Sequence, residues 1–385
     1  MECPFPPRSG SAHRNAAVAR ALSSLGPVMS LGMAGGTGGE APAGIVGRSL
    51  ASTGGRKVWK FDRPDHPTEM TLDQAIRQEL HACLETFAPD LVVVEGVALL
   101  EAAATLADAG ARVVLDMHNV ESRILAQALE NRPLHKRVFL PRGSAAAIGA
   151  AERADRRAVE IASQIWACSE EDGKILAGLQ SNEKTRTVRN PIPDESALSL
   201  EITPERYRHA DIAYVGHLSY FPNVEAVKVL LSQVAPLLAQ SGTHSSISVI
   251  GSGPARAVRR LCRSSGARLV ANPSDVVSHL SRAAYAPMPI RHGGGTRLKA
   301  LEALAAGLVV CATPKAIEGV GLVPDVHYLR CETPAAMAQC IAGLTRAPDR
   351  AADIAREGRR FVKERHCFPA IEAQVRSAIS ELTGS

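Results

Sequence analysis

Residues 291–302 read RHGGGTRLKALE, and this stretch decides the fold of the chain. It follows an apolar run, Ala284–Ile290, that predicts a buried strand, and it opens a segment with apolar residues at helical spacing. The order is therefore strand, glycine loop and helix. A helix N-terminus offers unpaired backbone N–H groups and partial positive charge, and glycines let a ligand approach them closely. The stretch therefore predicts an anion site.

Two cations, Arg297 and Lys299, lie in the first turn of this predicted helix. The helix dipole disfavours cations there by about 0.3–1 kcal/mol each, and a bound polyanion removes that penalty. Charge-assisted hydrogen bonds to phosphate contribute about 1.5–3 kcal/mol each. Residues two apart point to different sides of a helix, so we expect Lys299 to face the ligand more squarely than Arg297. The alternative is a glycine turn followed by a solvated basic helix start.

The bulk composition narrows the ligand class. A chain of 385 residues is longer than one ordinary core supports, so we expect two domains. Its 45% hydrophobic and 22% charged residues are typical of a globular protein. A net charge of +5 fits small anionic ligands better than nucleic acid, and an aromatic content of 4% argues against base-stacking surfaces. The expected polyanion is a nucleotide diphosphate.

The cysteines and the apolar runs indicate the compartment. The eight cysteines form no CxxC pair, so we expect neither a disulfide framework nor a structural zinc, and a reducing environment. No apolar run reaches the length of about 18 residues that a membrane span needs, and the N-terminus is not typical of a signal peptide. We therefore expect a cytoplasmic protein without a transmembrane segment, and a homodimer is left open.

Short apolar runs alternate with amphipathic stretches along the chain, which predicts parallel sheets covered on both faces by helices, an α/β fold. The predicted strands are Leu91–Glu95, Arg112–Asp116, Gln164–Cys168, Thr187–Asn190, Ile212–Val215, Ser246–Ile250, Arg268–Ala271, Ala284–Ile290 and Leu308–Ala312. The predicted helices are Ala12–Leu25, Leu72–Phe87, Ala98–Ala109, Ala145–Ala162, Val224–Leu238 and Phe368–Leu382.

Two irregular segments interrupt this alternation. A proline-bearing polar segment, from Pro191 to Arg208, divides the predicted strands into two sets, as a domain linker does. Residues Leu31–Gly55 are rich in glycine and poor in apolar pattern, so we expect a flexible loop there. The sequence thus predicts two parallel-sheet domains joined by a linker.

Several pieces of the sequence occur in the order in which family 4 glycosyltransferases carry them. The segment GGGTRLKALEALAAGLVVCATPKAIEGVGL, residues 293–322, resembles the donor-binding segment of that family. The other matching pieces are Pro4–Ser11, Asp116–Ser122, Val215–Leu218, Phe221–Asn223 and Gly251–Pro254. The resemblance spans nearly the whole chain.

The resemblance implies a retaining enzyme with the GT-B fold, in which two Rossmann-like domains set their parallel sheets across a cleft. Residues 1–192 would form the acceptor-side domain, and residues 205–365 the domain that binds the nucleotide-sugar donor. A C-terminal helix at residues 366–385 would pack back onto the first domain.

Glu302 follows Lys299 by one helical turn and lies on the same face of the predicted helix. A carboxylate there suits ribose hydroxyls, as in dinucleotide folds, and the resembled family uses this glutamate so. The alternative is a plain intrahelical Lys–Glu pair. The family also places a glutamate near the donor at the position of Glu318, and an exposed loop acid is the alternative. The remaining donor-side residues that the resemblance implies are Gly10, Ser11, Gly216, His217, Gly251, Gly253, Gly294, Gly295, Thr296 and Leu298.

The sequence departs from the family pattern at three positions. Gly294 replaces the first glutamate of the family's E-x7-E pattern, so that contact is missing or backbone amides of the glycine loop replace it. Many members have an arginine where this chain has His217, and a lysine where it has Pro222. These departures place more of the phosphate charge on the two cations of the helix start.

On the acceptor side, His118 and Asn119 follow the predicted strand Arg112–Asp116. Polar residues at the carboxyl end of a parallel strand lie at the rim where α/β folds bind ligands. By resemblance His118 is catalytic, near the reacting sugar, and Asn119 contacts the acceptor. The alternative is a histidine satisfied in a turn. Glu121 either orients His118 or is a first-turn helix acid.

The N-terminal piece supplies the other acceptor-side residues. Backbone N–H groups of Gly10 and Ser11 are expected to reach the phosphate, and His13 and Arg14 to contact the acceptor. The alternative is an ordinary helix cap by Ser9 or Ser11.

The expected activity is transfer of a sugar from a nucleotide-diphosphate sugar to a small-molecule or glycan acceptor, with retention of configuration. Arg297 and Lys299 would stabilise the leaving diphosphate, so no metal and no cofactor are expected. The alternatives are a nucleotide-sugar epimerase of similar two-domain fold and a non-catalytic nucleotide-sugar binder. A dehydrogenase is disfavoured because no complete GxGxxG follows a strand. The donor and the pathway stay open between natural-product and cell-surface glycan biosynthesis.

Overall fold

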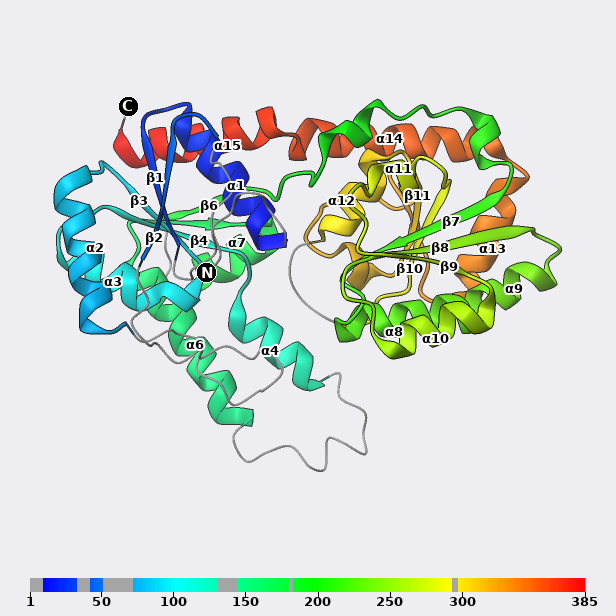
Figure 1. Ribbon diagram of the computed structural model, residues 1–385, viewed down its shortest axis with the longest axis horizontal. Helices are drawn as coiled ribbons and strands as arrows, with labels where there is room; N and C mark the ends of the chain where they lie inside the picture. The colour runs from blue at the N-terminus through cyan, green and yellow to red at the C-terminus, as the bar shows by residue number, and fades with distance from the viewer. Residues whose placement is uncertain are drawn as a thin grey trace. The chain divides into compact units, whose positions relative to one another are not determined.

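The computed structural model describes residues 10–32, 42–50, 72–130, 144–179, 183–292 and 297–384. The described residues form two compact units. The first runs to Pro191 and includes the chain from Phe368 onward, and the second covers the described residues between these points. Both units consist of parallel strands with helices around them (Figure 1), which confirms the predicted α/β class. The domain limits 1–192 and 205–365 stay a prediction.

A four-stranded parallel sheet forms the middle of the first unit. Its strands, in spatial order, are β3 (Val92–Glu95), β4 (Val113–Met117), β5 (Gln164–Ala167) and β6 (Thr185–Thr187). Every residue of β4 is buried, as expected for a parallel strand covered on both faces. The β3–β4 register sets Glu95 opposite Asp116, so two carboxylates meet near the carboxyl-end edge of the sheet.

The two faces of this sheet carry separate cores, because successive strand residues point to opposite sides. On one face, Val114 and Trp166 pack with α1 (Gly10–Ser23) and α15 (Phe368–Thr383), which lie side by side (Figure 1). On the other face, Val113 and Leu115 belong to the core that α2, α3 and α6 cover. The remaining helices of this unit are α2 (Gln74–Phe87), η1 (Val97–Leu99), α3 (Leu100–Asp108), α4 (Glu121–Glu130), α6 (Ser144–Ile161) and α7 (Glu170–Gly178).

A parallel pair of strands corrects one expectation. The strands β1 (Val28–Gly32) and β2 (Ile45–Ser49) pair along their whole lengths. The loop predicted over Leu31–Gly55 is therefore wrong where it overlaps these strands. The reason is that β2 interrupts its apolar pattern with a glycine and an arginine, so it has no clear period in the sequence. Residues 33–41 and 51–55 lie outside the described residues.

A six-stranded parallel sheet forms the middle of the second unit, in the spatial order β12-β11-β10-β7-β8-β9. The strands are β7 (Ala210–Val215), β8 (Ser245–Gly251), β9 (Arg268–Ala271), β10 (Tyr285–Met288), β11 (Val309–Ala312) and β12 (Leu329–Arg330). Most residues of β7 and all residues of β10 and β11 are buried, as expected for largely apolar central strands. Strands β7 to β11 agree with the five predicted for this part of the chain to within a few residues, whereas the two-residue strand β12 was not predicted.

Helices cover this sheet in two groups (Figure 1). One group is α8 (Phe221–Val229), the π-helix η4 (Leu230–Val234), α9 (Ala235–Gln240), α10 (Arg256–Ser265) and α13 (Pro334–Thr345). The other is α12 (Leu298–Ala305) and α14 (Pro348–His366), which pack on each other. Shorter elements are η2 (Glu195–Ser199), η3 (Pro204–Tyr207), α11 (Val277–Leu280) and η5 (Pro314–Ile317). Among the described residues, no helix is both long and apolar enough to cross a membrane.

Candidate functional site

The loops after β7 and β8 interlock at the carboxyl-end edge of the second unit's sheet. These strands pair in parallel, so both loops leave the sheet at the same edge. Leu218 N donates a hydrogen bond to Ser252 O at 2.8 Å. A Cβ at position 251 would lie 1.8 Å from the carbonyl oxygen of Gly216, so only glycine fits at Gly251. We call Gly216–Ser219, Gly251–Gly253 and Arg297–Lys299, at the start of α12, the donor rim.

His217 lies at the donor rim and is held within it by two serines. Its Nδ1 is 2.9 Å from Ser252 Oγ, and its Nε2 is 2.8 Å from Ser219 Oγ. A Cβ on Gly253 would come within 3.1 Å of the imidazole ring. The structure therefore brings His217, Gly216, Gly251 and Gly253 together, as the resemblance implies. Their contact with a donor stays a prediction.

Lys299 is the best-anchored cation of the donor rim. Its Nζ donates a hydrogen bond to Asn223 Oδ1 and lies 3.4 Å from Tyr214 Oη, and the Tyr214 hydroxyl donates to the same Asn223 oxygen at 2.9 Å. Asn223 Nδ2 donates to the carbonyl oxygen of His217 at 2.9 Å. Burial and, to a smaller extent, the charge of Arg297 lower the pKa of Lys299 to about 7, and the charge of Glu302 opposes them. Helix α12, strand β7 and helix α8 thus meet at one ammonium group.

Arg297 turns to a different partner, as the spacing of the two cations predicts. Its side chain is 10% exposed, and Nη2 lies 3.1 Å from Glu318 Oε2. Lys315 Nζ reaches the same carboxylate oxygen at 2.5 Å. Glu318 therefore lies beside the donor rim and is engaged by two cations. An exposed loop acid, the alternative in the sequence, does not describe it.

Glu302 does not form the intrahelical pair that was its alternative interpretation. Among the described residues no salt bridge joins it to Lys299, whose ammonium is directed to Asn223 and Tyr214. Burial and, to a smaller extent, the charge of Asp194 raise the pKa of Glu302 to about 7, and the charge of Lys299 opposes them. The carboxylate is thus a partly buried acceptor one turn into α12, and its role toward ribose stays a prediction.

Several predicted residues have a different place or no described place. Leu298 packs against the core of the second unit, so it supports the start of α12 from inside. Gly294, Gly295 and Thr296 lie outside the described residues, as does the piece from Pro4 to Ser9.

In the first unit, Arg14 is a buried structural cation rather than the expected acceptor contact. Its side chain is 1% exposed, and Nε lies 3.0 and 2.9 Å from the two carboxylate oxygens of Asp116. Its Nη1 donates to Val188 O at 2.6 Å and to Asn190 Oδ1 at 3.0 Å. The guanidinium therefore ties α1 to β4 and to the chain after β6. The burial of the side chain and these bonds to Asp116, Val188 and Asn190 give Arg14 a structural role.

His118 lies at the carboxyl end of β4 and forms a pair that the sequence did not predict. Its Nε2 is 3.0 Å from Glu95 Oε2, at the end of β3. Burial and the neighbouring Asp116 raise the pKa of Glu95 to about 7, and His118 and Arg14 oppose them. Cys168 Sγ donates to the carbonyl oxygen of His118 at 3.2 Å. The signal that was available is Glu95 itself, a polar residue that ends an apolar strand.

Three donor atoms of Glu95, Asp116 and His118 lie within 4.8 Å of one another, close enough to hold a metal ion. Both oxygens of Asp116 already accept hydrogen bonds from Arg14. The donor set therefore fits a hydrogen-bonded chain of charges better than a metal centre. The cluster consists of one guanidinium, Arg14, two adjacent carboxylates, Asp116 and Glu95, and one imidazole, His118.

Asn119 and Glu121 lead into α4. A hydrogen bond from the Asn119 side chain lowers the pKa of Glu121, but burial and Asp155 raise it on balance. Asp155, on α6, accepts hydrogen bonds from Glu121 N at 3.2 Å and Ser122 N at 3.0 Å, and so caps α4. Glu121 is therefore a first-turn acid of α4, whereas Glu95 contacts His118.

Gly10, Ser11 and His13 lie in the first turn of α1. The carbonyl oxygen of Ser11 is 2.6 Å from the amide nitrogen of Asn15 when that amide faces it. His13 is partly buried and Ser11 is exposed. The turn is thus close to the Glu95–His118 pair through Asn15, which the sequence analysis missed.

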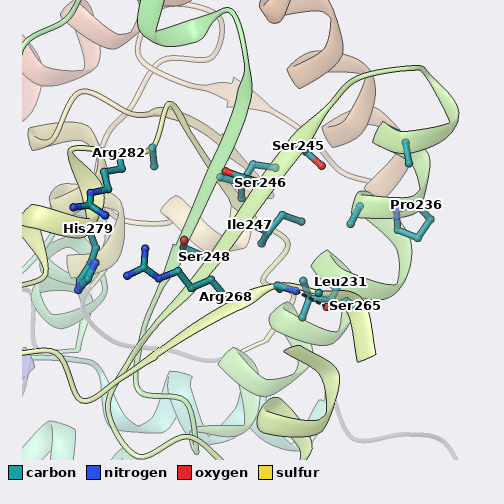
Figure 2. Close-up of a pocket in the computed structure, with 16 residues that line it drawn as sticks. Leu231, Pro236, Ser245, Ser246, Ile247, Ser248, Ser265, Arg268, His279 and Arg282 are labelled. Atoms are coloured by element: carbon teal, nitrogen blue, oxygen red, sulfur yellow. Dashed lines mark hydrogen bonds between the residues drawn. The ribbon is translucent and has the colours of Figure 1, made fainter. Parts of the chain in front are cut away.

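A cavity of about 720 Å³ lies elsewhere in the second unit, toward the amino ends of its strands (Figure 2). Its lining includes the first residues of β8, Ser245–Ser248, and Arg268 at the start of β9. Figure 2 shows Arg282 and His279 on one side and Pro236 on the other. No residue of the donor rim lines it. The candidate site therefore rests on the hydrogen-bonded rim at the opposite ends of the strands.

Residues 209–346 match the model of a protein family described as Glycosyl transferases group 1. The matched segment runs from β7 to the end of α13 and contains the whole donor rim together with Glu302 and Glu318. No match was found among curated protein sequences.

Solved structures share the fold over nearly the full chain. A glycosyltransferase from Rickettsia africae is 14% identical, with a TM-score of 0.66 over 97% of this chain and 96% of its own. Sucrose-phosphate synthase from Thermosynechococcus elongatus is 12% identical, with a TM-score of 0.69 over 98% and 94%. HepE from Anabaena, solved in complex with UDP, is 14% identical, with a TM-score of 0.63 over 92% and 100%. The fold is therefore that of GT-B glycosyltransferases, and residues 209–346 match the group 1 model.

Proposed function

We propose that the chain transfers a sugar from a nucleotide-diphosphate sugar to an acceptor, and that the diphosphate binds at the donor rim. The observation that carries this proposal is the placement of Lys299, whose ammonium is held at the start of α12 by Asn223 and Tyr214. This arrangement lies inside the segment that matches the group 1 glycosyltransferases. The UDP in the HepE complex supports a nucleoside diphosphate as the ligand class.

The donor rim provides positive charge where the leaving group would develop negative charge. As the bond between the sugar and the diphosphate breaks, charge grows on the diphosphate oxygens. Arg297, Lys299 and the N-terminus of α12 would stabilise that charge, with no metal needed on this scheme. Because the pKa of Lys299 is lowered to about 7, a bound diphosphate would also draw a proton onto its Nζ.

The remaining roles follow the placement of the residues. Glu302, once ionised, would accept hydrogen bonds from ribose hydroxyls. His118 would contact the reacting sugar, and Asn119 and His13 the acceptor. Retention of configuration and a place in natural-product or cell-surface glycan biosynthesis rest on the family resemblance alone. Arg14 is left out of the acceptor contacts, because its buried guanidinium binds the carboxylate of Asp116.

The first test is thermal unfolding with UDP, GDP, TDP, ADP and NAD, on the wild type and on Lys299→Ala. A ligand at 100 times its dissociation constant stabilises the folded state by about 2.7 kcal/mol. We expect one nucleoside diphosphate to raise the Tm of the wild type and to lose most of this effect in Lys299→Ala. The matched control is Lys228→Ala, because Lys228 is exposed on α8 and should leave the response intact. An equal rise in Tm in all three proteins would contradict the proposal that the diphosphate binds at Lys299.

Turnover separates transfer from its alternatives. The protein is incubated with the sugar nucleotide of the stabilising base, with and without a panel of sugar and small-molecule acceptors. Acceptor-dependent release of the nucleoside diphosphate supports the transferase. Isomerisation of the sugar without release would indicate an epimerase, and binding without either would indicate a non-catalytic binder.

A further inference from the structure

Strands β8 and β9 are incompletely covered at their amino ends. The first residues of β8, Ser245–Ser248, are exposed or half-buried, whereas Val249–Gly251 are buried. A parallel crossover usually carries a full helix, but between β9 and β10 the chain forms only α11, a helix of 4 residues. The cavity of about 720 Å³ lies at this poorly covered end of the sheet (Figure 2).

The side chains at this end of the sheet are polar and cationic. Arg268, the first residue of β9, is opposite Ser248 in the β8–β9 register, so the two side chains point to the same face. Ser246 lies on that face too, two residues before Ser248. His279 and Arg282 line the same cavity. Figure 2 shows the guanidinium of Arg268 directed toward the side on which these two residues lie.

The fold does not use the charge of the two arginines in this cavity. Within the described residues, neither guanidinium has an assigned salt bridge or hydrogen bond, and the lining contains no acidic residue. Two neighbouring carboxylates are engaged elsewhere: Asp211 Oδ1 accepts from Ser246 Oγ at 2.5 Å, and Asp275 Oδ1 accepts from Ser278 N at 3.0 Å. The basic side of the cavity therefore carries positive charge that these contacts leave available.

A structural arginine in the same region has a different environment. Arg206 donates from Nε to Ala283 O at 2.7 Å and from Nη2 to Leu280 O at 2.9 Å. Its Nη1 donates to Ala306 O at 3.0 Å. The guanidinium of Arg206 thus ties backbone segments together, whereas those of the two cavity arginines are exposed to solvent.

Two guanidiniums on one side of a cavity suit a dianion. Guanidinium groups bind phosphate through paired N–H donors, and serine hydroxyls can donate to the remaining oxygens. A phosphate monoester carries a charge of about −1.5 to −2 at pH 7, more than a single carboxylate. The cavity volume of about 720 Å³ is larger than a phosphate group needs and lies within the range of roughly 300–1,000 Å³ typical of small-molecule sites.

We propose that this cavity is a second anion site, which binds a small molecule through a dianionic phosphate group held by Arg268 and Arg282. Ser246 and Ser248 would donate to the phosphate oxygens. The apolar part of the lining would contact the organic part of a phosphate monoester; it includes Leu231, Ala235, Pro236 and Ala239. No residue of the donor rim lines the cavity, so the site is separate from the proposed function and does not rest on it.

The test is isothermal titration calorimetry of the full chain at pH 8, in a phosphate-free buffer, with phenyl phosphate, inorganic phosphate and benzenesulfonate. The two phosphates are dianions at this pH, and benzenesulfonate is a monoanion with the same ring as phenyl phosphate. We expect the sulfonate to bind at least about tenfold more weakly than phenyl phosphate, the scale of one lost charge-assisted hydrogen bond. Tighter binding of phenyl phosphate than of inorganic phosphate indicates a monoester as the ligand, and equal binding indicates free phosphate. Binding of neither phosphate, or equal binding of the sulfonate, would overturn the proposal.

Variants locate the binding. Arg268→Gln combined with Arg282→Gln should raise the dissociation constant of the phosphate at least about tenfold. The matched control, Arg260→Gln combined with Lys363→Gln, removes the same charge from exposed positions outside the lining and should leave the affinity unchanged.

The donor rim is tested separately with Lys299→Ala, which should bind phenyl phosphate as the wild type does. A loss in this variant alone would place the phosphate at the donor rim and overturn the second site, as would an equal loss in the matched control. A failure of every nucleoside diphosphate to bind the wild type would remove the proposed function and leave the cavity site standing. The Tm of each variant without ligand shows that the fold is retained.

Discussion

The ammonium of Lys299 and the side-chain oxygen of Asn223 form a hydrogen bond that joins the first turn of α12 to the first turn of α8, across 76 residues of sequence. Asn223 also binds the backbone of the loop after β7 through its amide nitrogen. One amide side chain thus fixes both a cation and a glycine-containing loop of the donor rim. The position of the Lys299 charge at the donor rim therefore depends on an uncharged side chain, that of Asn223.

Replacing Asn223 with aspartate should move the titration of Lys299. The pKa of Lys299 is lowered to about 7, so in the free protein the ammonium loses its proton as the pH rises through that value. A carboxylate at hydrogen-bond distance favours the charged form and raises such a pKa by about 1–3 units. The basic limb of the pH dependence of nucleotide affinity should shift to higher pH in Asn223→Asp. Asn223→Ala, which removes the acceptor without adding charge, should weaken binding without this shift.

Glu302→Gln should change how stability depends on pH. The pKa of Glu302 is raised to about 7 in the folded state, above the ordinary value of a glutamate. Its stabilising contribution is complete below the unfolded pKa and is lost as the pH rises through the folded pKa. The unfolding free energy of the wild type relative to Glu302→Gln should therefore fall between about pH 4.5 and pH 7, by at most about 3 kcal/mol. A difference that stays flat across this range, measured by denaturant titration, would contradict the shifted pKa.

Adding a methyl group at Gly251 should disrupt the donor rim. The new Cβ of Gly251→Ala would lie 1.8 Å from the carbonyl oxygen of Gly216, and neither backbone can move without breaking the interlocked loops. We expect a lower Tm and loss of the nucleotide response. Gly343→Ala is the control, because nothing lies within 4 Å of a Cβ on that exposed helical glycine. There alanine should stabilise α13 by about 0.5–1 kcal/mol.

Removing the charge of Arg14 should destabilise the first unit strongly. Arg14→Met leaves the buried carboxylate of Asp116 without its partner, which typically costs about 3–5 kcal/mol. The same change in an exposed pair, Arg356→Met beside Asp353, should cost less than about 0.5 kcal/mol. Chemical unfolding curves for both variants make the comparison. Similar losses in the two would show that burial does not set the strength of the Arg14 pair.

Local patterns in the sequence were enough to predict where most strands lie and where α12 begins. Apolar runs of four to seven residues marked β3, β4, β5 and the strands β7 to β11, because a buried parallel strand is largely apolar. The two-residue strand β12 is too short to give such a run and was not predicted. The strand predicted at Thr187–Asn190 overlaps β6 only at Thr187, since Val188 is buried beyond the strand end. The two-residue spacing of Arg297 and Lys299 was also enough to predict that their side chains point to different sides of α12.

The partners of these side chains could not be predicted in the same way. Tyr214 lies 85 residues from Lys299, and Asp116 lies 102 residues from Arg14. Periodicity reports which face of an element is buried, but it does not report which distant element covers that face. Arg14 was therefore read as a ligand contact from its position near a helix start, although its neighbours Ala12 and Val18 are core residues.

The packing of α15 on α1 has a consequence for the order of events on the ribosome. One face of the first unit's sheet, with Trp166 and Val114, is covered by α1 together with residues 368–383. The strands of that sheet leave the exit tunnel long before this helix is synthesised, because the whole second unit is translated in between. While the second unit is translated, α1 alone is present to cover this face. Residues 368–383 complete the cover once they emerge.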